Sequence, residues 1–297
     1  MKRRLILSAA LTTMLFTGFI SCASKQEEVK KEIGLQLYSI RDEIQKDLGA
    51  SLDSVAAAGY NFVELASYNP QEGTFYGMEP EAFAAFCKEK GLNVVSSHIN
   101  GPDPNATPLE ECLAWWDKAI ADHVKLGVSY IVQPSMWQSA YESVEGLANY
   151  CNLFNLVGEK CNVAGIRFGY HNHAHEFTTV FDGVVMYDYM LTNTSPEKVF
   201  FQIDVYWSQV GGASAVEYME KYPGRFELWH VKDDKEIGAS GKIDFNALYQ
   251  KAEISGMKYA IVEQEAFDLA PFASIKASYD YLNNAPYVKV SFRLPKP

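Results

Sequence analysis

The chain has 297 residues, with 26 basic and 37 acidic side chains and a net charge of −11 at neutral pH. Hydrophobic residues make up 48% of it and aromatic residues 13%, which is enough for a large core in one big domain or two small ones. Such an acidic chain is poorly suited to binding nucleic acid, whose phosphates attract basic surfaces.

The first 21 residues have the pattern of a secretory signal, with a basic start followed by an apolar stretch. Ser21 then precedes Cys22, as at a bacterial lipoprotein processing site. We therefore expect a signal peptide at 1–21, a lipidated Cys22, and a polar tether at 22–32. The mature chain would carry a charge of −14, and it would touch the membrane only through this lipid, facing the periplasm or the cell surface.

From residue 33 onward, short apolar runs alternate with longer amphipathic runs, which is typical of repeated βα units. The predicted strands are 33–39, 62–66, 93–98, 130–134, 166–173, 200–206, 226–232 and 259–263. The predicted helices are 48–58, 80–90, 109–126, 144–164, 215–221, 245–255 and 272–282. Several helices end in a glycine, the usual residue just past a helix end.

Eight such units predict an α/β fold, a single-domain (β/α)8 TIM barrel over residues 33–290. A doubly wound open sheet is the alternative, but no glycine-rich phosphate turn follows an early strand. Four cysteines, which we expect to be buried in helices rather than paired in disulfides, lie within this domain: Cys87, Cys112, Cys151 and Cys161.

The barrel prediction carries a test, because the active site of this fold lies at the C-terminal ends of its strands. Polar side chains do gather where the apolar runs end, and in a barrel these ends converge on one pocket. From the first four predicted strands they are Gln36, Tyr38, Glu64, His98 and Gln133, and Trp137 follows shortly after. We expect these six residues to bind substrate.

The fifth predicted strand ends in three histidines at alternate positions, His171, His173 and His175, in the run IRFGYHNHAHEF. Side chains two apart on a strand share a face, so all three can point toward one place. A cluster of this kind needs a common partner such as a metal or an anionic intermediate.

Asp204, His230 and Glu263 lie at or near the ends of the three predicted strands that follow. With His171 as a fourth ligand from the fifth strand, they form a mixed carboxylate and imidazole site without a thiolate. Such a site suits a divalent Mn²⁺, Mg²⁺, Co²⁺ or Zn²⁺ that keeps positions open for substrate oxygens.

The chain resembles the xylose isomerase-like barrel superfamily, in its sugar phosphate isomerase/epimerase branch, over about residues 33–282. The motifs that carry the resemblance are GLQLYS at 34–39, VEL at 63–65, YHNH at 170–173, ID at 203–204, HVKD at 230–233 and VE at 262–263. The resemblance implies the same four metal ligands, but ketose epimerases of this superfamily have a glutamate where this chain has His171. The YHNH pattern is closer to inosose dehydratase-like members and to subunits that cleave 3-keto-glycosides.

The shared chemistry that this implies is removal of a proton next to a sugar ketone, with a divalent ion stabilising the oxyanion. His173 is the candidate base, Glu265 the second candidate, and Lys232 a candidate to hold a hydroxyl or the enolate oxygen. Loss of a C1 leaving group would make the protein a 3-keto-glycoside lyase, the expectation that export and the lack of a phosphate cradle favour.

Reprotonation of the same or a neighbouring carbon would make it a keto-sugar epimerase or isomerase. An inactive sugar-binding lipoprotein is an alternative of another class, although its ligands would be expected to have decayed. Cleavage of abasic nucleic acid is disfavoured by the charge.

Overall fold

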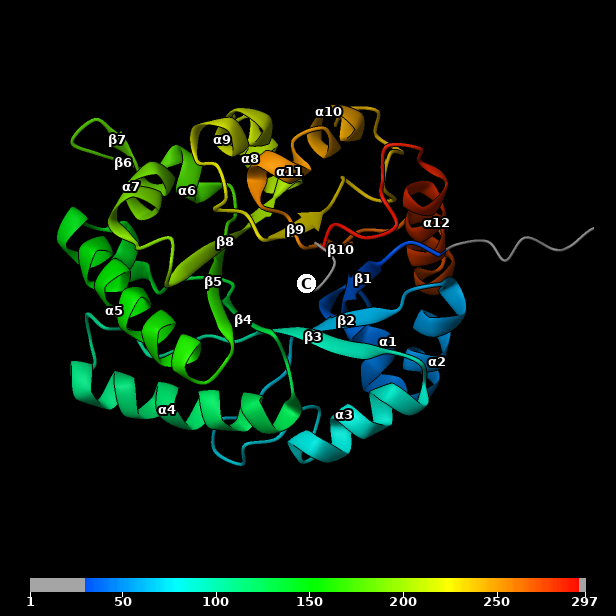
Figure 1. The fold of residues 1–297 in the computed structure, drawn as a ribbon, viewed down its shortest axis with the longest axis horizontal. Helices are drawn as coiled ribbons and strands as arrows, with labels where there is room; N and C mark the ends of the chain where they lie inside the picture. Colours follow the sequence, from blue (N-terminus) through cyan, green and yellow to red (C-terminus); the bar gives the residue numbers. More distant parts are fainter. Residues whose placement is uncertain (1–29, 294–297) are drawn as a thin grey trace, which may run out of the picture.

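A computed structural model describes residues 30–293. Its centre is a closed barrel of eight parallel strands in the order β1-β10-β9-β8-β5-β4-β3-β2, with helices around the outside (Figure 1). The barrel strands are β1 (Ile33–Gln36), β2 (Phe62–Leu65), β3 (Asn93–His98), β4 (Tyr130–Gln133), β5 (Arg167–His171), β8 (Val199–Asp204), β9 (Leu228–Val231) and β10 (Tyr259–Val262). The predicted single-domain TIM barrel is confirmed.

Amphipathic helices connect these strands and cover the barrel. The long ones are α2 (Leu48–Ala58), α3 (Pro80–Glu89), α4 (Leu109–Leu126), α5 (Val144–Val163) and α12 (Pro271–Asn284). The short ones are α1 (Arg41–Lys46), α6 (His175–Thr178), α7 (Met186–Asn193), α8 (Val205–Val210), α9 (Ala215–Lys221), α10 (Phe245–Tyr249) and α11 (Ala252–Ser255). Two 3₁₀ turns, η1 (Leu37–Ile40) and η2 (Gln138–Tyr141), and a hairpin of β6 (Val180–Phe181) and β7 (Val184–Val185) complete the described elements.

The helix boundaries follow from local chemistry. Ser143 begins α5 by accepting a hydrogen bond from the backbone N–H of Gly146 at 3.0 Å. Gly127 ends α4 in the left-handed region, at φ 81°, where its N–H caps the last carbonyls. All four cysteines of the domain are buried and free, in α3, α4 and α5, as predicted.

Two strands are shorter than predicted because the polar residue at each strand end begins a helix. The side chain of Gln36 accepts from the backbone N–H of Tyr38 at 3.0 Å, and the chain turns there into η1. Asp204 does the same for Trp207 at 2.7 Å, and β8 gives way to α8. Polar side chains that compete for backbone donors favour such helix caps over continued strand.

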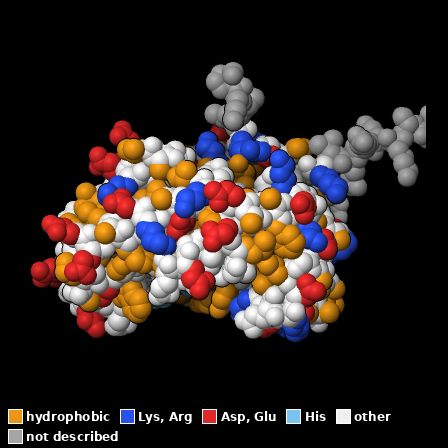
Figure 2. All heavy atoms as spheres, turned by 90° about the horizontal axis from the view of Figure 1, so that it is seen from below, with side chains coloured by type: hydrophobic (Ala, Val, Ile, Leu, Met, Phe, Trp, Pro, Cys, Tyr) orange, Lys and Arg blue, Asp and Glu red, His pale blue; other side chains and the backbone are white. Residues whose placement is uncertain are grey.

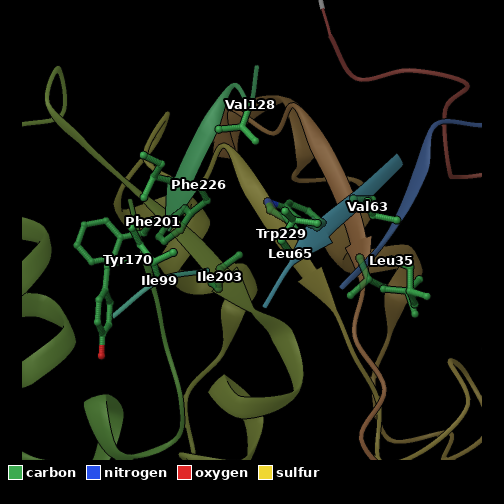
Figure 3. Close-up of a cluster of buried hydrophobic side chains, with 14 of the residues drawn as sticks. Leu35, Val63, Leu65, Ile99, Val128, Tyr170, Phe201, Ile203, Phe226 and Trp229 are labelled. Atoms are coloured by element: carbon green, nitrogen blue, oxygen red, sulfur yellow. The ribbon is translucent and has the colours of Figure 1, made fainter. Parts of the chain in front are cut away.

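The strands bury side chains on both faces, as expected for a parallel sheet covered by helices. The outward face packs against the helices, and Figure 3 shows Leu35, Val63, Phe201 and Trp229 among the buried side chains of this cluster. A second, smaller cluster fills the barrel interior toward the N-terminal ends of the strands: Phe62, Val95, Tyr130, Val132, Phe200, Leu228 and Ile261, with Tyr259 against it. We call this second cluster the apolar plug.

Above the apolar plug, the inward positions turn polar. Phe62 is followed two residues later by Glu64, Phe200 by Gln202 and then Asp204, and Leu228 by His230. The register pairs Gln36 with Glu64 on neighbouring strands and Asp204 with His230. Alternation along each strand therefore builds one apolar and one polar layer inside the same barrel.

The predicted signal peptide and most of the predicted tether lie outside the described residues. Lys31 and Glu32, at the end of that tether, already bond to the C-terminal segment: Glu32 N donates to the carbonyl of Val290 at 2.8 Å, and the Lys31 ammonium donates to the carbonyl of Ala285 at 2.5 Å.

Between residues 30 and 293, we find no helix that combines the length and the apolar character needed to cross a bilayer. On the face shown in Figure 2, acidic and basic side chains are interspersed.

Candidate active site and metal centre

Four side chains from four neighbouring strands meet inside the C-terminal half of the barrel: His171 of β5, Asp204 of β8, His230 of β9 and Glu263, directly after β10. One donor atom from each lies within 4.8 Å of the others, and all four residues are buried. The Nδ1 atom of His230 lies 3.3 Å from a Glu263 oxygen and 4.0 Å from Asp204 Oδ2. The group could therefore hold one ion, as the sequence predicted.

The nitrogen and oxygen atoms that face one another in this group fit a cation. Nδ1 of His171 and Oδ2 of Asp204 are both buried and have no hydrogen-bond partner within residues 30–293. An unpaired buried donor or acceptor is costly, so two such atoms within one four-residue group indicate a missing partner. Two carboxylates and two imidazoles suit a divalent ion of the predicted kinds.

The pKa shifts of these side chains follow from burial and from their charged neighbours. Burial raises the pKa of Asp204 to about 7, a shift that Lys232 opposes and Glu263 reinforces. Burial and the neighbouring His230 hold the pKa of His171 well below its usual range. His230 shows the opposite shift: burial lowers its pKa, but Glu263 and Glu64 outweigh it and raise the pKa to about 10. A bound divalent ion would keep all four side chains deprotonated.

A cavity of about 370 Å³ opens beside this group at the C-terminal end of the barrel. It is lined by Tyr38, Ala66, His98, Asn100, Pro134, Ser135, His171, His173, Glu263 and Glu265. Of the residues predicted to contact substrate or do chemistry, the structure thus brings Tyr38, His98, His173 and Glu265 to the cavity wall. A larger hollow of about 560 Å³ at the other end of the barrel is lined by none of the predicted site residues.

Four predicted substrate-binding residues do not line the cavity. Gln36 and Glu64 are fully buried beneath it and bond to each other at 2.8 Å, because their inward strand positions lie one layer deeper. Gln133 is buried and donates to the carbonyl of Ser135 at 2.8 Å. Trp137 is 58% exposed, and its indole N–H donates to the carbonyl of Gly101 at 3.2 Å, outside the cavity wall.

The three histidines of the fifth strand do not share one face, because β5 ends at His171. His173 follows in the loop and lines the cavity, whereas His175 begins α6 and bonds to the hydroxyl of Tyr141 at 2.9 Å. The rings of His173 and His175 still stack, with centroids 5.5 Å apart. Only His171 belongs to the four-residue group, and the prediction of a single focus for all three is wrong.

Glu176 fixes the loop that carries His173. Its carboxylate accepts from the backbone N–H of His173 at 2.8 Å and from the hydroxyl of Tyr170 at 2.5 Å, and His175 lies 3.2 Å away. Glu176 is fully buried, which would raise its pKa, but His175 and Tyr170 bond to the carboxylate and hold the pKa below its usual range. Although His173, His175 and Glu176 lie close enough to hold a second ion, the carboxylate is already satisfied by these bonds.

Lys232 lies deeper than predicted. It is 2% exposed and does not line the cavity; its ammonium pairs with Glu263 at 3.0 Å and with Glu265. The ammonium also lies 4.9 Å from the centre of the Trp207 ring. Burial would lower the pKa of Lys232, but Glu263, Asp204 and Glu265 raise it, so the side chain stays charged.

Two polar cavity residues, Asn100 and Ser135, were missed in the sequence. They bond to each other, with the Ser135 hydroxyl 3.1 Å from the Asn100 amide oxygen. Each lies two residues beyond a polar strand end that was predicted, His98 and Gln133 respectively. Continuing the period of two past the strand would have identified both.

Comparison with known proteins agrees with this geometry. The sequence profile of the family described as "Xylose isomerase-like TIM barrel" matches residues 52–285. A sugar phosphate isomerase/epimerase from Parabacteroides distasonis is 35% identical, with a TM-score of 0.83 over 90% of this chain and 98% of that one. A second structure of this description from the same organism is also 35% identical, with a TM-score of 0.78 over 87% of this chain and 100% of that one.

More distant structures share the fold. The 3-keto-D-glucoside 4-epimerase from E. coli is 16% identical, with a TM-score of 0.66 over 86% of this chain and 100% of that one. No curated protein sequence matches the chain. The family profile and the 35% identical structures are decisive: the chain belongs to the xylose isomerase-like TIM barrel family, a superfamily of sugar isomerases and epimerases.

Proposed function

We propose that the protein is a metal-dependent enzyme that removes the proton next to the ketone of an unphosphorylated sugar. Its best substrate class is a 3-keto-glycoside, which loses its C1 substituent by β-elimination. One observation carries the proposal: a proton acceptor, His173, lines the same cavity as two members of the buried four-residue metal group, His171 and Glu263.

The ion's contribution is limited to one effect. Held by His171, Asp204, His230 and Glu263, a divalent ion would supply Lewis-acid stabilisation of negative charge on the carbonyl oxygen of the sugar. The rest of the reaction depends on the side chains of this chain.

His173 is suited to accept the proton. Burial lowers the pKa of its ring, so the ring is neutral near pH 7. Its buried Nδ1 has no partner within the described residues, while its backbone is fixed by Glu176. The ring can therefore take a proton from C2, the carbon between the C3 ketone and C1.

The elimination balances without a further reagent. The C2–H bond breaks and its electron pair forms the C1–C2 double bond, while the C1–O bond breaks and its pair leaves with the aglycone oxygen. That oxygen takes up a proton from protonated His173 or from water. The products are the free aglycone and an unsaturated keto sugar.

Lys232 does not line the cavity and acts on this site through its neighbours. Through its ion pairs it holds the carboxylates of Glu263 and Glu265 in place at the cavity wall. Glu265 remains the second candidate base, since its side chain is 37% exposed and lines the cavity.

The cavity wall supports an unphosphorylated substrate. No lysine or arginine is among its lining residues, whereas Glu263 and Glu265 both are. Arg41, the arginine nearest the first strand, does not line the cavity itself: it donates to the carbonyl of the cavity residue Tyr38 at 3.0 Å and lies 4.2 Å from the centre of the Tyr38 ring. A phosphate in this cavity would meet carboxylates and no fixed cation from the protein.

Epimerisation is the second candidate, and a specific observation favours it. His173 from the β5 end and Glu265 from the β10 end both line the cavity, so one could remove a proton and the other return it to the opposite face. The E. coli neighbour named as a 3-keto-D-glucoside 4-epimerase and the isomerase/epimerase relatives agree with this outcome.

Proton NMR in D₂O with the metal-loaded enzyme separates the two. A 3-keto-glucoside and a free ketose would be tested side by side, with metal-free enzyme as the control. Aglycone release together with an unsaturated keto sugar supports elimination. Deuterium at the carbon next to the ketone without aglycone release supports epimerisation or isomerisation, and binding with neither change supports a sugar-binding protein without catalysis.

We also infer that the chain is exported and anchored through a lipid on Cys22, on the pattern of its first 22 residues. Mass spectrometry of the N-terminal peptide from the native host tests this. A diacylated Cys22 at the mature N-terminus supports it, and an intact Met1 would contradict it.

A further inference from the structure

The carboxylate of Glu64, on β2, lies in the polar layer directly beneath the cavity and is surrounded by four donors. Its Oε1 lies 2.5 Å from Nε2 of His230 and 3.0 Å from Nε2 of His98, and it accepts from Gln36 at 2.8 Å. Its Oε2 accepts from the amide of Gln202 at 2.8 Å. Glu64 has no exposed surface, and these four groups are the polar partners of its carboxylate within the described residues.

The orientation of Gln202 determines the proton position on His98. A carboxylate only accepts hydrogen bonds, so the NH₂ group of Gln202 must face Glu64 and its Oε1 is left as an acceptor. That Oε1 lies 2.7 Å from Nε2 of His98. Nε2 of His98 therefore faces two oxygens and has to carry the ring proton.

The consequence for His98 reaches the cavity. A neutral imidazole carries one proton, so a proton on Nε2 leaves Nδ1 with a free lone pair. His98 lines the cavity, while its Nε2 is directed into the polar layer. Nδ1 is thus the nitrogen that can accept a hydrogen bond from a hydroxyl of a bound sugar.

His230 is oriented by the same carboxylate. Its Nε2 faces Glu64, and its Nδ1 faces Glu263 at 3.3 Å and Asp204 at 4.0 Å. With Nε2–H bonded to Glu64, Nδ1 is the only ring nitrogen that an ion could take. Carboxylates that bond to the far nitrogen of a ligating histidine fix its tautomer and its ring orientation.

We propose that Glu64 is a positioning residue that fixes the tautomers of two histidines at once. It holds Nε2–H on His230, which leaves Nδ1 to the ion, and Nε2–H on His98, which leaves Nδ1 as an acceptor for a substrate hydroxyl. The His230 part rests on the proposed metal-dependent function, whereas the His98 part rests only on the hydrogen bonds of the polar layer.

The test reads the tautomers directly. Full-length protein with ¹⁵N-labelled histidine is studied by long-range ¹H–¹⁵N NMR, metal-free and with Zn²⁺, and His98→Gln and His230→Gln assign the signals. We expect the proton of His98 on Nε2 in both states. We expect His230 to keep Nε2–H and to bind zinc through Nδ1.

The Glu64→Gln variant removes the charge and presents a donor beside the acceptor. We expect His98 to lose its single tautomer and the zinc affinity to fall about 10- to 100-fold. Gln36→Met is the matched control: Gln36 donates to the same Glu64 oxygen but bonds to neither histidine, so both tautomers should persist.

A proton on Nδ1 of His98 in the wild type, or unchanged tautomers and zinc affinity in Glu64→Gln, would overturn the proposal. If the variant does not fold, the wild-type spectra alone still decide the matter. The outcomes also separate this proposal from the proposed reaction: correct tautomers in a protein that leaves keto-glycosides intact would refute only the latter.

Discussion

Asn172 holds the backbone of Asp204 from both sides. Its amide oxygen accepts from the backbone N–H of Asp204 at 3.1 Å, and its amide nitrogen donates to the Asp204 carbonyl at 3.4 Å. Tyr187 also donates to the Asn172 oxygen, at 3.2 Å, and the side chain is fully buried. The asparagine of the YHNH motif thus extends the pairing of β5 and β8 just where Asp204 of the four-residue group is presented.

Replacing Asn172 by alanine should loosen Asp204 without removing it. We expect the affinity for Zn²⁺ or Mn²⁺ to fall about 10- to 100-fold, as for other residues that support metal ligands, measured by competition with a fluorescent chelator. Asn162→Ala, which removes an exposed amide bonded to the Glu197 carbonyl at 2.8 Å, is the control and should keep full affinity. Equal affinities in the two variants would refute the role of Asn172.

Asp204→Ala should abolish stoichiometric divalent metal in the purified protein, because it removes one of two carboxylate ligands. Elemental analysis after dialysis measures this. Asp122→Ala is a suitable comparison: its carboxylate is buried on α4, where Tyr68 and two lysines bind it, far in the fold from the barrel interior. Full metal occupancy in Asp204→Ala would show that the site has been assigned wrongly.

His173→Ala should lower turnover about 10²- to 10⁴-fold, the usual contribution of a general base. The metal content should stay at the wild-type level, because His173 is outside the four-residue group. Deuterium exchange at the carbon next to the ketone is the measurement. His175→Gln should keep most of the exchange, and full exchange in His173→Ala would place the base elsewhere, with Glu265→Gln the next variant to test.

Gly34→Ala should destabilise the fold by about 1–3 kcal/mol, the usual cost of overpacking a core. A Cβ atom at Gly34 would lie 2.1 Å from the ring of Phe62 in the apolar plug. Gly49→Ala is the opposite case, because the atom nearest to an added Cβ would lie 3.4 Å away. Alanine is also favoured over glycine in a helix by up to about 1 kcal/mol. In urea unfolding, the free energy of unfolding should decrease in the order Gly49→Ala, wild type, Gly34→Ala. Any other position for Gly34→Ala in this order would contradict the packing.

The buried His123 should make the protein less stable in acid. Burial lowers the pKa of its ring to about 4, against an ordinary value of about 6.5, so the unfolded chain binds the proton more tightly. Stability is therefore lost as the pH falls from about 6.5 to about 4, by up to about 3 kcal/mol. His123→Leu should flatten this loss in urea unfolding at pH 7 and pH 4.5.

His175 provides a control of opposite sign. Its pKa is raised, chiefly by its bond to Glu176, so it stabilises the fold at acid pH and this contribution is lost as the pH rises through the folded pKa. His175→Gln should therefore make the loss toward acid pH steeper. Identical slopes in both histidine variants would contradict the two assignments.

The fold could be predicted from the sequence because it depends on periodicity. All eight barrel strands were located, and three of the predicted helices, α2, α4 and α9, match to the residue. The strand ends were harder, because Gln36 and Asp204 cap the following helices and cut their strands short. The predicted helix at 245–255 is two short helices, α10 and α11.

The sequence predicted well which site residues face the barrel interior, and less well how far along the barrel axis they lie. The alternation identifies which residues face inward, so the sequence predicted the four residues that meet in the buried group and the cavity residues His98, His173 and Glu265. It does not say how far along the barrel axis a residue lies. Glu64 and Gln36 were therefore expected at the substrate and lie a layer below it, and their role depends on long-range bonds that no local pattern reveals.

The apolar plug has a consequence for the order in which an ion and a sugar would bind. Phe62, Tyr130, Phe200 and Tyr259 pack edge to face across the barrel, with ring centres 5.1 to 5.9 Å apart, and seal that end. Under the proposed function, we expect an ion held by Asp204 and His230 to enter and leave through the cavity of about 370 Å³ at the opposite end, where the sugar would bind. We therefore expect the ion to bind before the sugar, and we expect bound sugar to slow the removal of the ion by chelators.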